Sequence, residues 1–369
     1  MPNAIKLWKA SELNSARKRA MAWFVENGRD LPWRRTSDPY RIWVSEIMLQ
    51  QTQVTTVIPF YERFLTSFPS VADLAKATLD EVYRHWSGLG YYRRARQKHE
   101  AANKIAQGLL GVFPDRTEAV QKLPGIGRYT ANAILTFSGD QRLPIVEANT
   151  QRLYARLLHL NADTSTKDSQ AKLWSFAEQV LPAKNGSGQI NQAFMEIGSQ
   201  ICLPKNPHCM ICPLHKLCPT YASASQKIIP APKKAKQFTD LREAALIVRD
   251  AKERVLMRRC GQDERWAGLW DFPRFDVTEC TSNIAVRKKL ASQFRTRFGR
   301  GVLIGNELHQ LKHAVTRYRI TLDSFEAQMD PESTGKWSTE VETVWAEQKR
   351  MEDLALSSSG KKLWAWLRT

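Results

Sequence analysis

The strongest constraint on the fold of this chain is a change of hydrophobic pattern near residue 222. Before it, apolar residues recur at intervals of three and four, as in amphipathic helices. After residue 240, the runs Ala244–Asp250 and Arg254–Cys260 have the composition of short strands joined by a tight polar link. The sequence therefore predicts a multidomain protein, with an all-α domain followed by an α+β domain.

The length of 369 residues exceeds what one hydrophobic core usually supports, which agrees with this division. We predict a helical domain over residues 1–221, a linker over 222–240 and a second domain over 241–369. The linker is rich in Ser, Ala, Pro and Lys, and residues 222–238 offer little to bury. The segments with helical spacing in the first domain are 11–27, 40–52, 82–90, 92–110, 127–138 and 171–181. In the second domain we expect further strand over 309–327, a helix near 284–298 and another helix at the C-terminus.

The composition is strongly basic, with 55 Lys and Arg against 37 Asp and Glu and a formal net charge of +18. This excess favours a polyanionic partner, either nucleic acid or an anionic membrane surface. No stretch approaches the roughly 20 apolar residues that span a bilayer, and residues 1–20 lack the apolar core of a signal peptide. We therefore expect an intracellular monomer without a membrane partner, cytoplasmic and nucleoid-associated if the protein is bacterial.

Four of the six cysteines lie close together with the spacing C-x6-C-x2-C-x5-C. They are Cys202, Cys209, Cys212 and Cys218. In a reducing compartment such clustering favours a metal centre over disulfides. A structural zinc would also accept four thiolates, but zinc sites more often pair two C-x2-C knuckles and this chain has one. The spacing therefore favours an iron–sulfur cluster, and either metal is expected to be structural.

A glycine-rich turn runs from Leu123 to Arg128 and opens a predicted helix. Gly125 and Gly127 let the backbone approach a phosphate, and the free N–H groups and dipole of the helix attract its charge. An ordinary turn between helices would also contain glycine. The flanking Leu-Pro and Thr-Ala pairs indicate a helix-hairpin-helix motif, so Gly125, Gly127 and Arg128 are candidate DNA-binding residues.

The predicted helix around Glu46 places a carboxylate among apolar residues, including Trp43 and Met48. Desolvation would raise the pKa of Glu46 and keep the side chain protonated, as a general acid requires. The alternative is an exposed residue on a helix face. Gln50 and Gln51 follow, and their amide groups can read or wedge a base, although glutamines at a helix end are otherwise ordinary.

These motifs occur together, and in this order, in one family. The chain contains in sequence order P-W-R-R, D-P-Y-R-I-W-V-S-E-I-M-L-Q-Q-T-Q-V, G-L-G-Y-Y-R-R-A-R, L-P-G-I-G-R-Y-T-A and the cysteine quartet. Over residues 30–221 it resembles adenine DNA glycosylases of the MutY type, within the superfamily that includes endonuclease III. The resemblance implies a [4Fe-4S] cluster on the four cysteines, in a cluster loop spanning residues 202–218, and an enzyme of base-excision repair.

The resemblance also implies roles for individual residues. Glu46 protonates the adenine leaving group, and Tyr129 hydrogen-bonds near the reacting centre. Tyr91, with Gln50 or Gln51, enters the base stack while adenine is flipped out, because the glycosidic bond is unreachable inside a duplex. Lyase-active members have Lys at the position of Tyr129. Since Tyr cannot form a Schiff base, the resemblance implies monofunctional hydrolysis.

The second catalytic carboxylate of the family lies in a segment that usually reads D-G-N, where this chain has Glu147, Ala148 and Asn149. By resemblance, Glu147 stabilises the oxocarbenium-like sugar and helps to place water, while Asn149 is retained. Glu147 adds a methylene group, and a displacement of one ångström can cost about a hundredfold in rate. The alternative is that Glu147 is a helix N-terminal carboxylate facing the macrodipole.

Residues 241–369 resemble the Nudix-like domain with which MutY-type enzymes inspect the base opposite adenine. The resemblance rests on the two strand-like runs, on W-A-G-L-W-D-F-P beginning at Trp266, and on a strand beginning at Leu311. The metal box G-x5-E-x7-R-E-x2-E-E does not occur between Phe272 and Arg300. We therefore expect this domain to act in recognition and not in pyrophosphate hydrolysis.

A second departure lies in the loop that contacts 8-oxoguanine in the family. That loop reads Phe-Ser-His, whereas this chain has Val315, Thr316 and Arg317. Thr316 keeps a hydroxyl group, and Arg317 can donate to a guanine O6 or to a phosphate. The alternative is that Arg317 lies on an exposed strand face.

We expect a glycosylase that removes adenine mispaired with 8-oxoguanine or guanine from double-stranded DNA. Two other functions stay open. One is a glycosylase for another mismatched base, such as thymine opposite guanine, which the changes at Glu147 and at 315–317 could accompany. The other is a non-catalytic sensor of DNA damage with the same fold.

Overall fold

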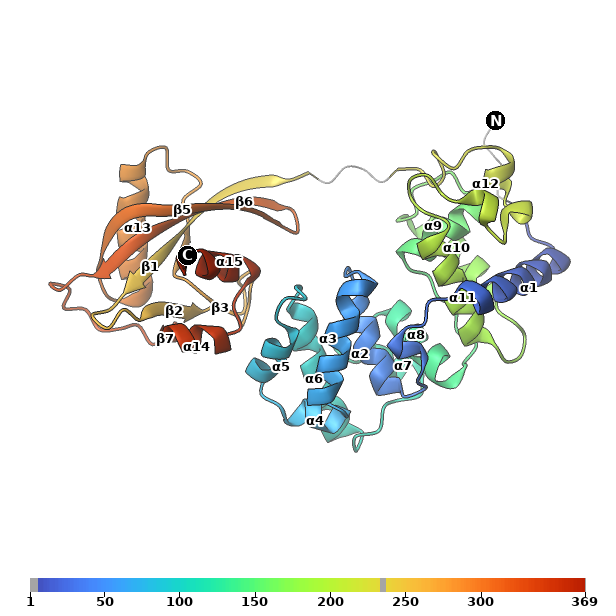
Figure 1. Cartoon of the computed structure of the whole chain (residues 1–369), viewed down its shortest axis with the longest axis horizontal. Helices are drawn as coiled ribbons and strands as arrows, with labels where there is room; N and C mark the ends of the chain where they lie inside the picture. The colour runs from blue at the N-terminus through green and yellow to red at the C-terminus, as the bar shows by residue number, and fades with distance from the viewer. Residues whose placement is uncertain (1–5, 233–236, 369) are drawn as a thin grey trace. The chain divides into compact units, whose positions relative to one another are not determined.

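The computed structural model describes residues 6–232 and 237–368. Contacts divide the chain into two compact units, Met1–Lys76 with Gln97–Lys234, and Ala77–Arg96 with Ala235–Thr369. The first unit is helical and the second is built around a sheet (Figure 1). The predicted fold class, all-α followed by α+β, is confirmed. None of the described helices has the length and apolarity to cross a bilayer.

The helical unit is a succession of helices joined by short turns. Its helices are α1 (Ala10–Asn27), α2 (Pro39–Leu49), α3 (Val54–Ser67), α4 (Val71–Lys76), α6 (Arg93–Gly108), α7 (Thr117–Gln121), α8 (Arg128–Gly139), α9 (Ala148–Leu158), α10 (Lys167–Gln179), α11 (Ser187–Gln200) and α12 (Pro219–Ala222), with the 3-10 helices η1 (Pro32–Arg34), η2 (Cys209–Ile211) and η3 (His215–Leu217). α5 (Leu79–Trp86) and the start of α6 belong to the second unit. The six segments with helical spacing form α1, α2, α5, α6, α8 and α10.

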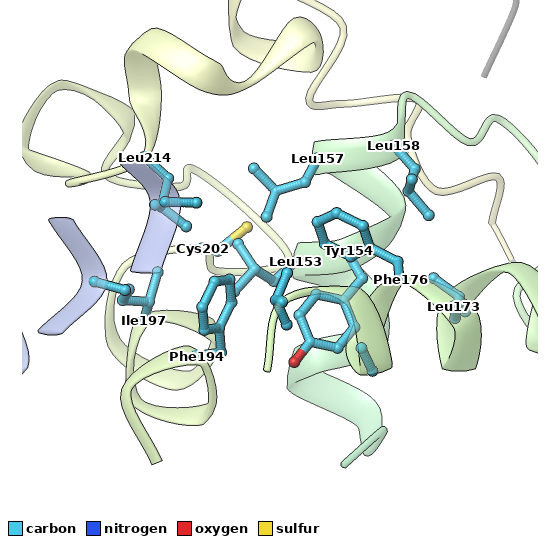
Figure 2. Packing of buried hydrophobic residues seen from close by; sticks show 14 of the residues in the cluster. Leu153, Tyr154, Leu157, Leu158, Leu173, Phe176, Phe194, Ile197, Cys202 and Leu214 are labelled. Carbon is cyan, nitrogen blue, oxygen red and sulfur yellow. The ribbon is translucent and has the colours of Figure 1, made fainter. Parts of the chain in front are cut away.

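A cluster of buried side chains joins α1, α9, α10 and α11. Tyr154 of α9 lies at its centre, with ring centroids 5.3 Å from Phe176 and 5.8 Å from Phe194 (Figure 2). Cys202 and Leu214 of the cysteine segment belong to the same cluster. The core therefore fixes α9 against the cysteine loop.

The second unit contains a mixed sheet with the strand order β3-β2-β1-β6-β5. Its strands are β1 (Thr239–Arg249), β2 (Val255–Arg259), β3 (Trp270–Asp271), β4 (Arg274–Asp276), β5 (Val302–Val315), β6 (Tyr318–Met329) and β7 (Thr343–Ala346). β1 runs parallel to β6, whereas β5 and β6 form an antiparallel hairpin. β4 pairs with β1, and β7 pairs with β2.

Helices cover both faces of this sheet (Figure 1). Alternate residues of β1 face the two sides. Leu246 and Val248 pack with α13 (Asn283–Phe298). Ala245 and Ile247 pack on the opposite face, which α14 (Gln348–Asp353) and α15 (Ser358–Leu367) cover. Side chains of successive strand residues point to opposite faces, so β1 serves both cores. The predicted strands over 244–250 and 254–260, the helix near 284–298 and the C-terminal helix are confirmed.

Two expectations need correction. The strand expected to begin at Leu311 begins earlier, at Val302, and the segment 309–327 turns back on itself between β5 and β6. The predicted linker contains a buried residue: Ile229 is 1% exposed, and its carbonyl accepts a hydrogen bond from Arg156. Residues 233–236 of that linker lie outside the described residues.

Candidate active site

Glu46 lies in the middle of α2, in an almost entirely buried stretch of helix. Asp38 caps the helix by accepting a hydrogen bond from the N–H of Tyr40 at 2.9 Å, and Pro39 occupies the first turn. Apolar residues on both sides of Glu46 are buried, and Glu46 itself is 4% exposed. Burial raises the pKa of this carboxyl group to about 7.

Tyr129 in the first turn of α8 contacts Glu46 directly. Its hydroxyl group donates a hydrogen bond of 2.7 Å to Glu46 Oε2. Burial, together with the negative charges of Glu46 and Glu147, raises the pKa of Tyr129 well above its usual value. The phenol therefore keeps its proton and holds the carboxyl group in one orientation.

Glu147 is the N-cap residue of α9. Its carboxylate accepts hydrogen bonds of 2.8 Å from the N–H groups of Asn149 and Thr150. Burial raises the pKa of Glu147, while these two N–H groups favour the charged form. Glu147 is therefore a helix N-terminal carboxylate, as the alternative predicted. The same side chain also lines a cavity, so this position is compatible with the catalytic role expected for it.

That cavity has a volume of about 500 Å³, within the usual range for small-molecule sites. The residues lining it that the sequence predicted as functional are Glu46, Gln50, Gln51, Tyr129, Glu147 and Asn149. Asn149 Oδ1 also accepts a hydrogen bond of 3.1 Å from Arg152. Segments far apart in sequence therefore bring two carboxyl groups, a phenol and several amides to one concave site.

The sequence reasoning missed a second charged group at the cavity, formed by Glu196, Arg29 and Arg34. The Glu196 carboxylate is buried in α11 and accepts from Arg29 Nε at 2.5 Å and Arg34 Nη2 at 2.7 Å. Burial alone would raise its pKa, but the two guanidinium groups outweigh burial and lower it. Arg34 lies in the P-W-R-R motif, whereas the sequence around Glu196 gives no signal of a site.

The helix-hairpin-helix turn lies between α7 and α8, as predicted. Gly125 has a φ of +78°, a conformation that favours glycine, and a Cβ atom there would lie 3.0 Å from Gln97. Gly127 is the N-cap residue of α8, and a Cβ atom there would meet nothing within 4 Å. Arg128 is exposed, and its guanidinium lies 3.9 Å from the ring centroid of Trp174. The backbone at Gly127 is therefore open to an approaching phosphate.

Of the predicted wedge residues, Gln51 and Tyr91 are exposed with left-handed backbone, whereas Gln50 is half-buried. Gln51 has a φ of +57° just after α2, and Gln50 Nε2 lies 3.5 Å from Thr130 Oγ1. Tyr91 has a φ of +49° and is 52% exposed. It belongs to the segment Ala77–Arg96 of the second unit and is not one of the residues lining the cavity.

The four cysteines surround η2 and η3 and are close enough for their charges to interact. Burial, with a smaller contribution from the neighbouring thiols, raises the pKa of Cys212 to about 12 and that of Cys218 to about 11. Over the described ranges, no three His, Cys, Asp or Glu side chains converge as a site for a metal ion. In a [4Fe-4S] cluster each thiolate binds a different iron, so the sulfur atoms need not converge on one point. Four thiols without disulfides fit such a cluster.

The loop expected to read the opposite base is the turn between β5 and β6. Val315 pairs with Tyr318 at the end of the ladder, and Thr316 has a φ of +54°. Arg317 lies in this turn and not on a strand face, so the alternative considered for it is wrong. Its Nη2 donates to the Tyr318 hydroxyl at 2.9 Å, and its guanidinium lies 5.1 Å from the Tyr318 ring centroid.

Comparison with known proteins finds a matching family model for each half of the chain. Residues 44–179 match the family model of the HhH-GPD superfamily base excision DNA repair protein, and residues 244–366 match that of the NUDIX domain. An adenine DNA glycosylase of Buchnera aphidicola (from Schizaphis graminum) is 31% identical over 92% of this chain and 95% of its own length. The adenine DNA glycosylase of Mus musculus is 38% identical over 72% of this chain and 52% of its own length.

Solved structures agree with the helical half. A thermostable thymine-DNA glycosylase matches with a TM-score of 0.53 and 27% identity, covering 58% of this chain and 98% of that one. An endonuclease III in a non-covalent DNA complex matches with a TM-score of 0.51 at 19% identity, covering 60% and 100%, and shows the shared fold. With the near full-length match to an adenine DNA glycosylase, these findings show that the chain belongs to the adenine DNA glycosylase family and is a MutY-type DNA glycosylase with a Nudix-like domain.

Proposed function

We propose that this glycosylase hydrolyses the bond between adenine and deoxyribose where adenine is mispaired with 8-oxoguanine or guanine in duplex DNA. The observation that carries the proposal is the hydrogen bond between Tyr129 and Glu46, in a cavity that also holds Glu147. A buried acid oriented by a phenol, beside a second carboxylate, is the arrangement that N-glycosidic hydrolysis requires.

Glu46 acts as the general acid. With a pKa of about 7 it is substantially protonated near neutral pH, whereas an exposed glutamic acid would be ionised. As the bond breaks, its electron pair leaves with the purine, which takes the proton of Glu46. Tyr129 keeps the carboxyl group in place and cannot attack the sugar as an amine does, which supports simple hydrolysis without strand cleavage.

Glu147 stabilises the positive charge that develops on the sugar. Its carboxylate is fixed by two backbone N–H groups, so it is pre-organised and faces the cavity. A water oxygen then bonds to the sugar carbon and its proton passes to a carboxylate, which completes the hydrolysis. Asn149 lines the same cavity and belongs to the group that positions the sugar and water.

The DNA contacts follow from the turn geometry and the charge of the chain. Gly125, Gly127 and Arg128 form a helix N-terminus suited to a phosphate, and the free backbone at Gly127 supports this assignment. Gln50 or Gln51 and Tyr91 enter the stack that adenine vacates when it is flipped into the cavity. Thr316 and Arg317 read the opposite base.

The cofactor in this proposal is a [4Fe-4S] cluster held by Cys202, Cys209, Cys212 and Cys218. It would supply a rigid, charged anchor for the loop at the C-terminal end of the helical unit, and no chemical step passes through it. Cys202 belongs to the core around Tyr154, and Cys212 and Cys218 pack against that core, which supports a structural role. Iron and sulfide analysis with visible absorbance tests the assignment, and stoichiometric zinc without iron would contradict it.

Single-turnover base release from duplexes with A:8-oxoG, A:G or T:G pairs tests the substrate. We expect release of adenine opposite 8-oxoguanine and guanine, without strand cleavage until the abasic site is treated with base. Release of thymine instead would favour the thymine alternative, which the similarity to a thymine-DNA glycosylase motivates. Tight binding of mispairs with no release of any base would favour the sensor alternative.

A further inference from the structure

Arg156 of α9 is an arginine whose donors are all used, and the function described so far gives it no role. Arg156 is 3% exposed, and its guanidinium donates to four backbone carbonyls and one cysteine sulfur. The guanidinium donates to Ile229 O at 3.0 Å, Cys202 Sγ at 3.2 Å, Leu203 O at 2.8 Å, Pro204 O at 3.4 Å and Gln226 O at 3.0 Å. These five bonds equal the number of N–H donors in a guanidinium group.

The five acceptors come from two separate segments. Three belong to the start of the cysteine loop, at Cys202, Leu203 and Pro204. The other two, Gln226 and Ile229, belong to the segment that leads from the cysteine loop towards the sheet unit. One rigid, planar group therefore holds both segments at once.

The backbone of Arg156 holds a third segment. Its carbonyl accepts a hydrogen bond of 2.7 Å from the Thr220 hydroxyl, directly after the last cysteine of the quartet. Arg156 thus contacts the start of the cysteine loop and two places after its last cysteine, and the helix that carries it is fixed by the core of Figure 2.

Other contacts make the second segment a docked element. Ile229 is 1% exposed, and its N–H, like that of Ile228, donates to Ser225 O at 3.1 Å. Gln226 Nε2 lies 3.8 Å from Cys209 Sγ, so a further cysteine of the quartet contacts this segment. The stretch 225–232 is therefore docked through Gln226 and Ile229, by the same group of residues that would hold the cluster.

We propose that Arg156 is a positioning residue that couples the iron–sulfur cluster to the docking of residues 225–232 on the helical unit. The inference rests on the cluster assigned under the proposed function. A bound cluster holds the cysteine loop in one conformation. In it, loop carbonyls and the Cys202 sulfur accept hydrogen bonds from the same guanidinium group that donates to Gln226 and Ile229. Because coupling between two binding events is reciprocal, docking of 225–232 in turn slows loss of the cluster.

The first test uses the full-length holoenzyme with Arg156→Lys. Lysine keeps the charge but has three donors on a flexible stem in place of a planar group with five. We expect amide hydrogen exchange over 225–232 to rise at least about tenfold, with exchange in α2 unchanged. Arg142→Lys is the control, because Arg142 also donates to backbone carbonyls, those of Pro182 and Glu178, away from the cysteines. Wild-type exchange over 225–232 in Arg156→Lys would overturn the proposal.

A second variant keeps the test decisive if Arg156→Lys does not fold. Ile229→Ser leaves Arg156 and all four cysteines in place but undermines the docked segment. We expect the visible absorbance of its cluster to decay about fivefold faster than that of the wild type under ferricyanide and a chelator. Decay at the wild-type rate would contradict this inference alone, whereas wild-type protein that contains no iron would contradict the proposed cofactor.

Discussion

The cavity around Glu46 and the turn at Thr316–Arg317 differ in almost every physical respect. In the cavity Glu46 is buried while Tyr129 and Glu147 are half-buried, and both carboxyl groups have specific partners: Tyr129 for Glu46 and two backbone N–H groups for Glu147. The turn is exposed, and the Arg317 side chain contacts its neighbour Tyr318. The residues of the cavity are mostly those typical of the family, whereas those of the turn are not.

The difference follows from what each region must do. Proton transfer to a purine requires a carboxyl group whose pKa is raised, and at Glu46 burial inside a packed domain is the main cause. A reading loop must meet a base in water, so its residues contribute little to the core and can change without loss of the fold. Substitutions should therefore abolish chemistry at the cavity and alter preference at the turn.

The largest effect is expected for Glu46→Gln. Gln is nearly isosteric but cannot give up a proton, so single-turnover adenine release should fall about a thousandfold. Binding of the mispaired duplex should change little, as an electrophoretic mobility shift would show. Glu62→Gln, an exposed glutamate on α3, is the control and should release base at the wild-type rate. Base release by Glu46→Gln within tenfold of wild type would remove the general acid from the mechanism.

Glu147→Gln should lower the single-turnover rate about a hundredfold, because it removes the negative charge opposite the developing cation. It also turns an NH₂ group towards one of the two backbone N–H donors, so the free energy of unfolding should drop by about 1 kcal/mol. Glu147→Asp keeps both the charge and the cap, and its rate should stay within about tenfold of wild type. If Glu147→Gln and the wild type release base at the same rate, the only role of Glu147 is to cap the helix.

The rate should also depend on pH. Since the pKa of Glu46 is about 7, base release should fall about tenfold per unit above that pH and level off below it. A rate profile over pH 5 to 9 measures this, with the rate of uncatalysed depurination subtracted. A flat profile up to pH 9 would mean that the acid has another identity.

The same group affects stability with a definite sign. The pKa of Glu46 is raised on folding, so its contribution to stability is present below pH 4.5 and is lost as pH rises to about 7. A shift from 4.5 to about 7 corresponds to about 3 kcal/mol. Urea unfolding of the wild type should show this loss, and Glu46→Gln should lack it. An identical pH dependence in the two proteins would contradict the assignment.

The smallest effect is expected at the turn. Arg317→Ala should lower the preference for 8-oxoguanine about fivefold, measured as the rate of adenine release from the A:8-oxoG duplex divided by that from the A:G duplex. The chemical step itself should be unchanged. Arg319→Ala is the matched control, because Arg319 is an exposed arginine at the start of β6, two residues beyond Arg317, and lies over Phe238. If both variants keep the wild-type ratio, the opposite base is read by other residues.

Local patterns predicted much of this molecule. The spacing of apolar residues predicted α1, α2, α6 and α8, and the glycines of 123–128 predicted the turn that opens α8. Segments without a clear pattern were missed, as with β3 and β4, which are too short for an alternation to be visible. The buried Ile229 within the predicted linker was also missed, because two isoleucines among Ser, Pro and Lys carry no periodic signal.

By itself, the sequence determined the two kinds of domain, the acid at position 46 within an apolar helix, and the grouping of four cysteines. Each depends on patterns among residues that are near one another in the sequence, so local physical chemistry decides it. Tertiary packing alone decided that Glu196 joins Arg34 across 162 positions, and that Arg156 holds the cysteine loop and the segment after it. Those contacts depend on how helices pack, and no local spacing encodes them.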